Sequence, residues 1–157
     1  MAAYYRIRCM NADPPEVREV RNLFENRVPH ITSGQVVIRG IVREPGSRTV
    51  LAVASTDPAA CAVGSCVGTR GAIVKGIVAE LHGEHIDIVR WDDSPKEFLS
   101  NLLAPMRFLT VSFDEASHQA TVVLRADSEL APSKTVALRS LLFRQLTGWV
   151  LQFDMES

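Results

Sequence analysis

Hydrophobic positions along the chain follow two spacings, one typical of helices and one typical of strands. A face of apolar residues three or four positions apart predicts an amphipathic helix over about residues 14–27. Its members are Val17, Val20, Phe24 and Val28. The stretches 36–42 and 49–55 are rich in β-branched residues, and the turn sequence Glu44-Pro45-Gly46-Ser47 joins them. This pattern predicts a β-hairpin directly after the first helix.

The next segment combines two short helices and a strand. We expect a helix from Pro58 to about Val67, an interruption at Gly68-Thr69-Arg70-Gly71, and a second helix over 72–82 that ends before Gly83. The alternation of apolar and polar residues around Ile86 and Ile88 then predicts a half-buried strand.

The second half of the chain repeats this order of elements. A helix is predicted from Pro95, two strands over about 109–113 and 120–124, a helical region that ends near Gly148, and a last strand at 151–153. The pattern helix–strand–strand–helix–helix–strand therefore occurs twice, with a boundary near 91–93. Such a duplication predicts an α+β protein of two domains.

Three predicted helix starts share the same chemistry, a capping side chain followed by proline. They are Asp13-Pro14, Asp57-Pro58 and Ser94-Pro95. The side-chain oxygen can accept a hydrogen bond from a free backbone N–H group, and proline fits the first helical turn. Glu16 and Glu97 follow two of these caps at the spacing of a capping box.

Composition and charge narrow the functional classes. Of the 157 residues, 46% are hydrophobic and 22% charged, as in an ordinary globular protein, and the net charge is −1. Residues 1–91 hold 11 Lys and Arg against 9 Asp and Glu, whereas residues 92–157 hold 6 against 9. A polyanionic partner would therefore favour the first half. Aromatic residues make up only 6%, which argues against a surface built on stacked bases.

The cysteines and the absence of known catalytic motifs exclude several other classes. Three cysteines without a secretory signal favour a reducing compartment, so we expect a cytoplasmic protein. Cys61 and Cys66 have no nearby His or Cys partner, so no metal site is expected. No segment of membrane-spanning length is evident, and we expect no membrane partner. The chain lacks a phosphate-loop lysine motif and a dinucleotide fingerprint, so we expect no enzyme activity and no cofactor.

The segment Gly68-Thr69-Arg70-Gly71 is the strongest candidate for a binding site. Its glycines allow a sharp turn and a close approach to a nucleic-acid backbone. We expect the helix that begins at Ala72 to present free N–H groups to phosphate, and Arg70 and Lys75 to add positive charge. A lone GXXG sequence is more often a tight turn between helices. Here the surrounding order of elements favours a clamp for about four nucleotides.

Several short sequence motifs, in the same order along the chain, resemble those of the NusA transcription elongation and antitermination factors. Residues 28–104 resemble the first KH domain of that family and its junction with the next domain. The matching stretches are 42–48, 63–71, 78–84, 86–89 and 103–105. The sequence at 146–149 resembles the end of the family's second KH domain.

The resemblance implies a fold and a function. It implies two tandem type II KH domains, each with the order αββααβ and a three-stranded sheet packed against helices. The expected divisions are an N-terminal extension at 1–12, a first KH domain at 13–92 with an intact GXXG loop, and a second at 93–157 with a degenerate loop. The chain has no room for the family's polymerase-binding domain and OB-type barrel, so we expect the tandem KH portion only.

The implied partner is single-stranded RNA, in the regulation of transcription elongation, termination or antitermination. RNA polymerase and other transcription factors are further possible partners. The candidate RNA-binding residues comprise the loop and its surroundings together with two arginines at the hairpin turn. They are Gly68, Thr69, Arg70, Gly71, Ala72, Lys75, Arg43 and Arg48.

The second domain departs from the family pattern. Residues 131–137 read APSKTVA, without a glycine, where a second GXXG loop is expected. We therefore expect a folded second domain that contributes little RNA contact. The alternative function is a non-enzymatic protein-interaction module that docks on RNA polymerase or a ribonucleoprotein, with RNA binding secondary.

Overall fold

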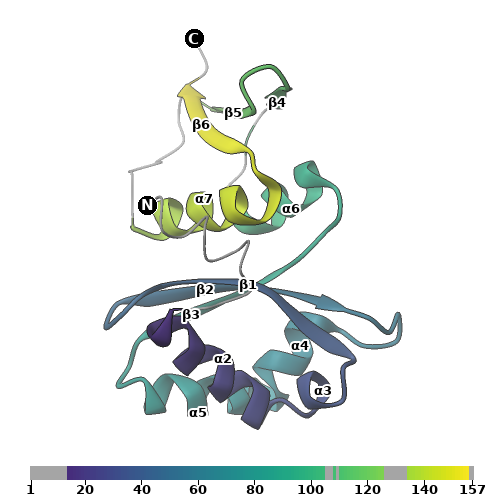
Figure 1. Cartoon of the computed structure of the whole chain (residues 1–157), viewed down its shortest axis with the longest axis vertical. Helices are drawn as coiled ribbons and strands as arrows, with labels where there is room; N and C mark the ends of the chain where they lie inside the picture. The colour runs from purple at the N-terminus through teal and green to yellow at the C-terminus, as the bar shows by residue number, and fades with distance from the viewer. Residues whose placement is uncertain (1–13, 105–107, 109, 126–133, 156–157) are drawn as a thin grey trace. The chain divides into compact units, whose positions relative to one another are not determined.

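The computed structural model describes residues 14–104, 108, 110–125 and 134–155. The chain divides into two compact units, Met1–Trp91 and Asp92–Ser157, which we call the first and the second module. Each module is described by itself (Figure 1).

The first module has a three-stranded sheet with helices on one face (Figure 1). Its elements are α2 (Pro15–Arg27), α3 (Pro29–Thr32), β1 (Val36–Glu44), β2 (Arg48–Ser55), α4 (Ala62–Val67), η1 (Thr69–Gly71), α5 (Ala72–Glu80) and β3 (His85–Arg90). The strand order is β1-β2-β3. β1 and β2 are antiparallel, whereas β2 and β3 are parallel. A parallel neighbour requires a crossover, and α4, η1 and α5 form it.

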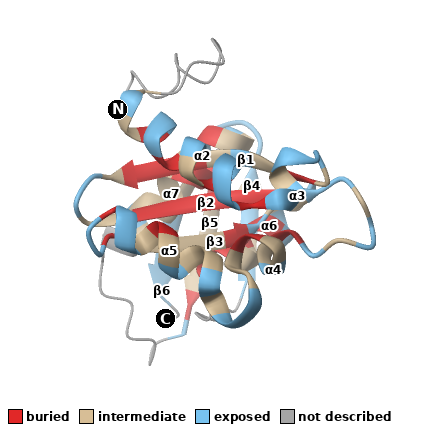
Figure 2. Ribbon diagram, turned by 90° about the horizontal axis from the view of Figure 1, so that it is seen from below, coloured by how far each residue is buried: buried red, intermediate tan, exposed pale blue. Residues whose placement is uncertain are grey.

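The core of the first module lies between the helices and the sheet. The predicted face of α2 is buried, with Val17, Val20 and Phe24 at most 3% exposed. Leu51 of β2 and Ile77 of α5 are fully buried in the same cluster. Figure 2 shows the buried parts of β1 and β2 together with these helices. The helical and strand periodicities therefore predicted this core correctly.

The second module is built in the same way from fewer described elements. These are α6 (Pro95–Leu103), β4 (Thr110–Asp114), β5 (Gln119–Leu124), α7 (Lys134–Thr147) and β6 (Val150–Met155). The sheet order is β4-β5-β6, with β4 and β5 antiparallel and β5 and β6 parallel. Phe98 of α6 and Phe143 of α7 are both fully buried, with ring centroids 6.1 Å apart.

The predicted fold class is confirmed: the chain is an α+β protein with two three-stranded sheets, each packed against helices. The parallel crossover in each sheet is the one that the order αββααβ requires. The extra helix expected before α7 would fall on residues 126–133, which lie outside the described residues.

The predicted cap at Asp57 is wrong. The Asp57 carboxylate accepts a hydrogen bond from the N–H group of Ala59 at 2.9 Å, so it closes a local turn. Helix α4 starts later, at Ala62, with Cys61 as its N-cap residue. The Cys61 sulfur accepts a hydrogen bond from the N–H group of Gly64 at 3.4 Å. Competition from the Asx-type turn thus delays the helix.

The other two predicted starts differ in outcome. Ser94 is the N-cap of α6 as predicted, and its hydroxyl accepts from the N–H group of Glu97 at 3.5 Å. Helix α2 begins at Pro15 with Pro14 in the cap position and without a side-chain cap. Asp13, the predicted cap, lies outside the described residues.

Candidate nucleic-acid interface

The loop between α4 and α5 makes a tight turn with unusual backbone angles. Gly68 has φ 79° and ψ 171°, a conformation that is essentially restricted to glycine. Arg70 and Gly71 then adopt left-handed conformations, with φ of 56° and 74°. The N–H group of Gly71 donates to the Gly68 carbonyl at 3.1 Å and closes the turn.

The two glycines are required for different reasons. A Cβ atom on Gly68 would lie 2.6 Å from Cγ1 and 3.0 Å from the backbone nitrogen of Ile73. The loop backbone therefore packs directly against the first turn of α5. A Cβ atom on Gly71 would meet Lys75 Cε at an ordinary 3.5 Å, so only the left-handed angle favours glycine there.

Most of the predicted site residues come together at this loop. Thr69, Arg70 and Lys75 are exposed, and the aliphatic part of Lys75 lies beside Gly71. Both cations therefore lie at the N-terminal end of α5, where the helix dipole also favours an anion. One expectation is corrected: the N–H group of Ala72 donates to the Thr69 carbonyl, so it is not free for phosphate.

Some apolar side chains of α4, α5 and β3 are only partly covered. They are Val63 of α4, Ile73 of α5, and Ile86 and Ile88 of β3, and we call them the apolar border. Each packs against the buried core of the first module and keeps some exposed surface. These elements therefore leave some apolar surface uncovered.

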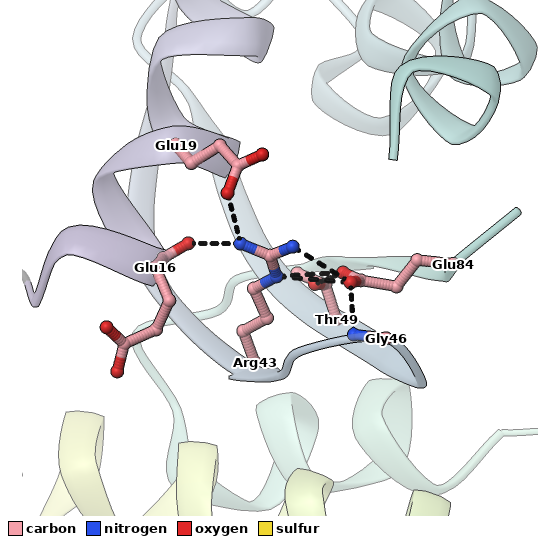
Figure 3. A network of polar contacts seen from close by, with 6 residues as sticks. All are labelled: Glu16, Glu19, Arg43, Gly46, Thr49 and Glu84. Atoms are coloured by element: carbon pink, nitrogen blue, oxygen red, sulfur yellow. Dashed lines mark hydrogen bonds and ion pairs between the residues drawn. The ribbon is translucent and has the colours of Figure 1, made fainter. Parts of the chain in front are cut away.

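Arg43 does not belong to this surface, which corrects the prediction of an RNA-binding role for it. Its side chain is 7% exposed, and all three guanidinium nitrogens donate to groups of the first module (Figure 3). Nε and Nη2 each donate to the Glu84 carboxylate at 3.0 Å. Nη1 donates to the Glu16 carbonyl at 2.7 Å and to Glu19 Oε2 at 2.9 Å.

Glu84 is the buried counterpart that the sequence analysis missed. It is 2% exposed and also accepts from Thr49 Oγ1 at 2.7 Å and from the N–H group of Gly46 at 2.9 Å. Burial alone would raise the pKa of Glu84, but the hydrogen bonds from Arg43, Thr49 and Gly46 outweigh it and lower this pKa. Burial likewise disfavours the charged form of Arg43, yet its hydrogen bonds to Glu84 and Glu19 raise its pKa.

Arg48, the second arginine of the hairpin, also has a partner in the first module. Its Nη1 donates to Asp87 Oδ2 at 2.8 Å, and both side chains are about a quarter exposed. The pair bridges β2 and β3. Arg48 therefore lies on the sheet, separate from the residues that gather at the loop.

The first module is similar to a known protein family. Residues 15–91 match the family model of the NusA-like first KH domain. In KH domains a GXXG loop clamps the backbone of about four nucleotides. The first module is thus similar to a KH domain of the NusA type.

Two relatives extend the likeness across both modules. The chain is 40% identical over 141 residues to the transcription termination/antitermination protein NusA of Bacillus subtilis. It is 33% identical over 135 residues to the protein of the same name from Thermus thermophilus. These alignments cover 88% and 86% of this chain, but only 37% and 35% of the relatives. The chain thus spans little more than a third of their length.

A solved structure supports the fold of both modules. The crystal structure of APE1850 matches with a TM-score of 0.58, over 86% of this chain and 96% of that chain. The two sequences are 17% identical, so the likeness concerns the fold alone.

The corresponding loop region of the second KH-like module differs from that of the first. Residues 134–137 form the first turn of α7, which continues without a break to Thr147. No glycine occurs in this helix. Residues 131–133 of the predicted degenerate loop lie outside the described residues.

Other kinds of site find little support. Within the described ranges, no three His, Cys, Asp or Glu residues are grouped so that they could hold a metal ion. Burial raises the pKa of the Cys66 thiol to about 11, which makes this cysteine unreactive at neutral pH. The segment Ala62–Glu80 is long and apolar enough to cross a membrane, but the KH loop at 68–71 divides it into two helices.

Proposed function

We propose that the first KH module binds single-stranded RNA through the loop at residues 68–71. The observation that carries this proposal is the conformation of the loop. Gly68 holds the backbone against α5, while Arg70 and Gly71 turn it in left-handed conformations at the helix N-terminus. Thr69 and Arg70 between the two half-buried glycines are exposed, so the backbone of this turn can come close to a sugar–phosphate chain.

The cations and the apolar border have different proposed roles in RNA binding. Arg70 and Lys75 attract phosphates, assisted by the dipole of α5. The apolar border offers surface to the bases. Because the described residues here include no aromatic side chain, base recognition relies on apolar contact and shape more than on stacking.

The names of the relatives support a proposal for the cellular role. We infer that this chain acts in the regulation of transcription elongation, termination or antitermination, in the cytoplasm. RNA polymerase and other transcription factors are its proposed protein partners. The proposed domains are 13–92 for the first KH domain and 93–157 for the second, with 1–12 as an extension.

A second function, protein interaction, is favoured for the second module. Residues 92–157 carry three more acidic than basic side chains, which disfavours a polyanion. The helix at 134–147 lacks the glycines that a close backbone approach needs. On this view the second module docks on RNA polymerase or a ribonucleoprotein, and RNA binding by the chain is secondary.

Replacement of Thr69 and Arg70 by aspartate tests the proposed function. The variant T69D/R70D places negative charge where phosphate should bind, so we expect a loss of affinity of at least about tenfold, or about 1.4 kcal/mol. A random pool of short single-stranded RNA is titrated at several salt concentrations. The slope of log K against log salt should become less negative, because phosphate contacts are lost.

The variant R18D/N22D is a matched control. Arg18 and Asn22 are exposed on α2, and the double change alters the net charge by the same amount. We expect at most a small loss for this control. Unchanged RNA affinity in a folded T69D/R70D protein would overturn the clamp and favour the protein-interaction function.

A further inference from the structure

The two ends of α5 have different roles. Its N-terminal end carries the loop at 68–71, and its C-terminal end leads to Glu84 and then directly into β3. His82 and Gly83 have φ of 56° and 90°, and the N–H group of Gly83 donates to the Val78 carbonyl at 2.9 Å. The chain thus leaves the helix in a fixed C-terminal turn and places Glu84 immediately after it.

Glu84 joins this turn to three other parts of the first module. Its carboxylate accepts hydrogen bonds from Gly46 in the hairpin turn, from Thr49 in β2 and from Arg43 in β1 (Figure 3). Through Nη1, Arg43 extends the connection to Glu16 and Glu19 of α2. We call these six residues the Glu84 network. The N–H group of His85 adds a hydrogen bond to the Ser47 carbonyl at 3.1 Å.

We propose that Glu84, held by Arg43, is a positioning residue for RNA binding that does not itself contact RNA. This inference rests on the proposed function of the loop at 68–71. Helix α5 has nine residues and is about 13 Å long, so an anchor at one end orients the loop at the other. The same anchor fixes the start of β3, which carries Ile86 and Ile88 of the apolar border.

Stability alone does not explain this network. Removing two charges from water costs free energy, and apolar residues of similar size often stabilise a fold as well as a buried ion pair does. The guanidinium contributes geometry instead, because its planar fork holds a carboxylate in one orientation. The network therefore suits a task that requires a fixed loop position.

Two conservative variants test the inference on the full chain. E84Q keeps the shape of the side chain but removes its charge. The amide N–H group of the new side chain would then face N–H or O–H donors that now bind the carboxylate. R43K keeps the positive charge but loses the fork. For both we expect RNA affinity to fall about threefold to tenfold, as for residues that act without touching a ligand. The salt slope should stay that of the wild type, because no phosphate contact is lost.

The backbone amide of Gly46 reports on the network directly. It donates to Glu84 Oε1 at 2.9 Å, so its hydrogen exchange should become faster in E84Q. If either single variant unfolds, the apolar double variant R43L/E84L replaces it, since such replacements often preserve the fold. We expect the same loss of RNA affinity from this double variant.

Each alternative result leads to a different conclusion. Wild-type RNA affinity in folded E84Q and R43K would mean that the network only stabilises the fold, and it would overturn the inference. Retained affinity in R43K, together with a reduced salt slope in R43L/E84L, would instead make Arg43 a phosphate contact and also overturn it. If T69D/R70D has no effect, the proposed function of the loop fails independently of these variants.

Discussion

The two modules share a sheet topology but differ at the place where a KH loop is expected. In the first, the backbone turns sharply through Gly68, Arg70 and Gly71 before α5 begins. In the second, α7 is a continuous helix from Lys134 to Thr147. The difference teaches that the sheet topology and the proposed clamp are separable, because the same strand order occurs with a glycine turn before α5 and, over the described residues 134–147, with a continuous helix.

An arginine in each module also has a different set of partners. The first module encloses the Arg43–Glu84 pair, which connects β1 and the hairpin turn with the α5–β3 junction. In the second module, Arg139 of α7 donates to the carbonyls of Leu102 and Ala104 at the end of α6. One arginine thus positions a loop beside the proposed RNA surface, whereas the other closes a helix end.

The two tryptophans allow each module to be followed separately. Trp91 belongs to the first module and Trp149 to the second. In the full chain, a W149F background therefore reports unfolding of the first module through Trp91. A W91F background reports the second.

The largest effect is expected from Gly68→Ala. The new Cβ would lie 2.6 Å from Ile73 Cγ1, in a backbone conformation that only glycine adopts readily. We expect the free energy of unfolding of the first module to fall by about 3 kcal/mol or more. Gly148→Ala is the matched change in the second module, where φ is +83° and no atom lies within 4 Å, and should cost about 1 kcal/mol. Urea unfolding in the two tryptophan backgrounds measures both, and equal losses would contradict the role assigned to Gly68.

A smaller effect is expected from Arg139→Leu. The change removes the donors to the carbonyls at the end of α6, and hydrogen bonds from a charged group contribute about 2 kcal/mol. The W91F background should show this loss in the second module. RNA affinity should stay within about twofold of the wild type, a difference of less than 0.5 kcal/mol in order of magnitude. A loss of RNA affinity like that of R43K would remove the contrast between the two arginines.

The smallest effect is expected on the pH dependence of stability, which reports the charge of Glu84. Its pKa in the folded protein is lowered from the ordinary value of 4.5, so its contribution to stability is present above that value. This contribution is lost as the pH falls through the lowered folded pKa. The difference in unfolding free energy between wild type and E84Q should be constant from neutral pH to about pH 5 and should shrink in stronger acid. A difference that grows as the pH falls would contradict the assigned charge state.

Local patterns predicted the elements because their signals lie within one or two turns. The apolar face of α2, the Ser94 cap of α6 and the GXXG turn all depend on residues a few positions apart. The start of α4 was misplaced because Asp57 can cap a helix or close its own turn, and both uses look alike in sequence. The four-residue α3 carried no periodic signal at all.

The site was predictable only where it is local. Residues 68–72 and Lys75 lie within about two turns of one helix, so their association followed from spacing. Arg43 and Glu84 are 41 positions apart, and nothing near either residue indicates the other. An arginine beside a hairpin turn has the same local appearance whether it faces phosphate or a buried carboxylate. Only the parallel pairing of β2 and β3 brings Glu84 to that turn.

The central claim is that the first module is the RNA clamp and the second is not. A direct comparison of T69D/R70D with K134D/T135D tests it, because both double changes replace one threonine and one cation by aspartates and alter the net charge equally. The full-length variants are titrated with the same single-stranded RNA pool at the same salt concentration. We expect a loss of at least about tenfold for the first and less than about twofold for the second. Comparable losses would make the second module a working clamp and contradict the account.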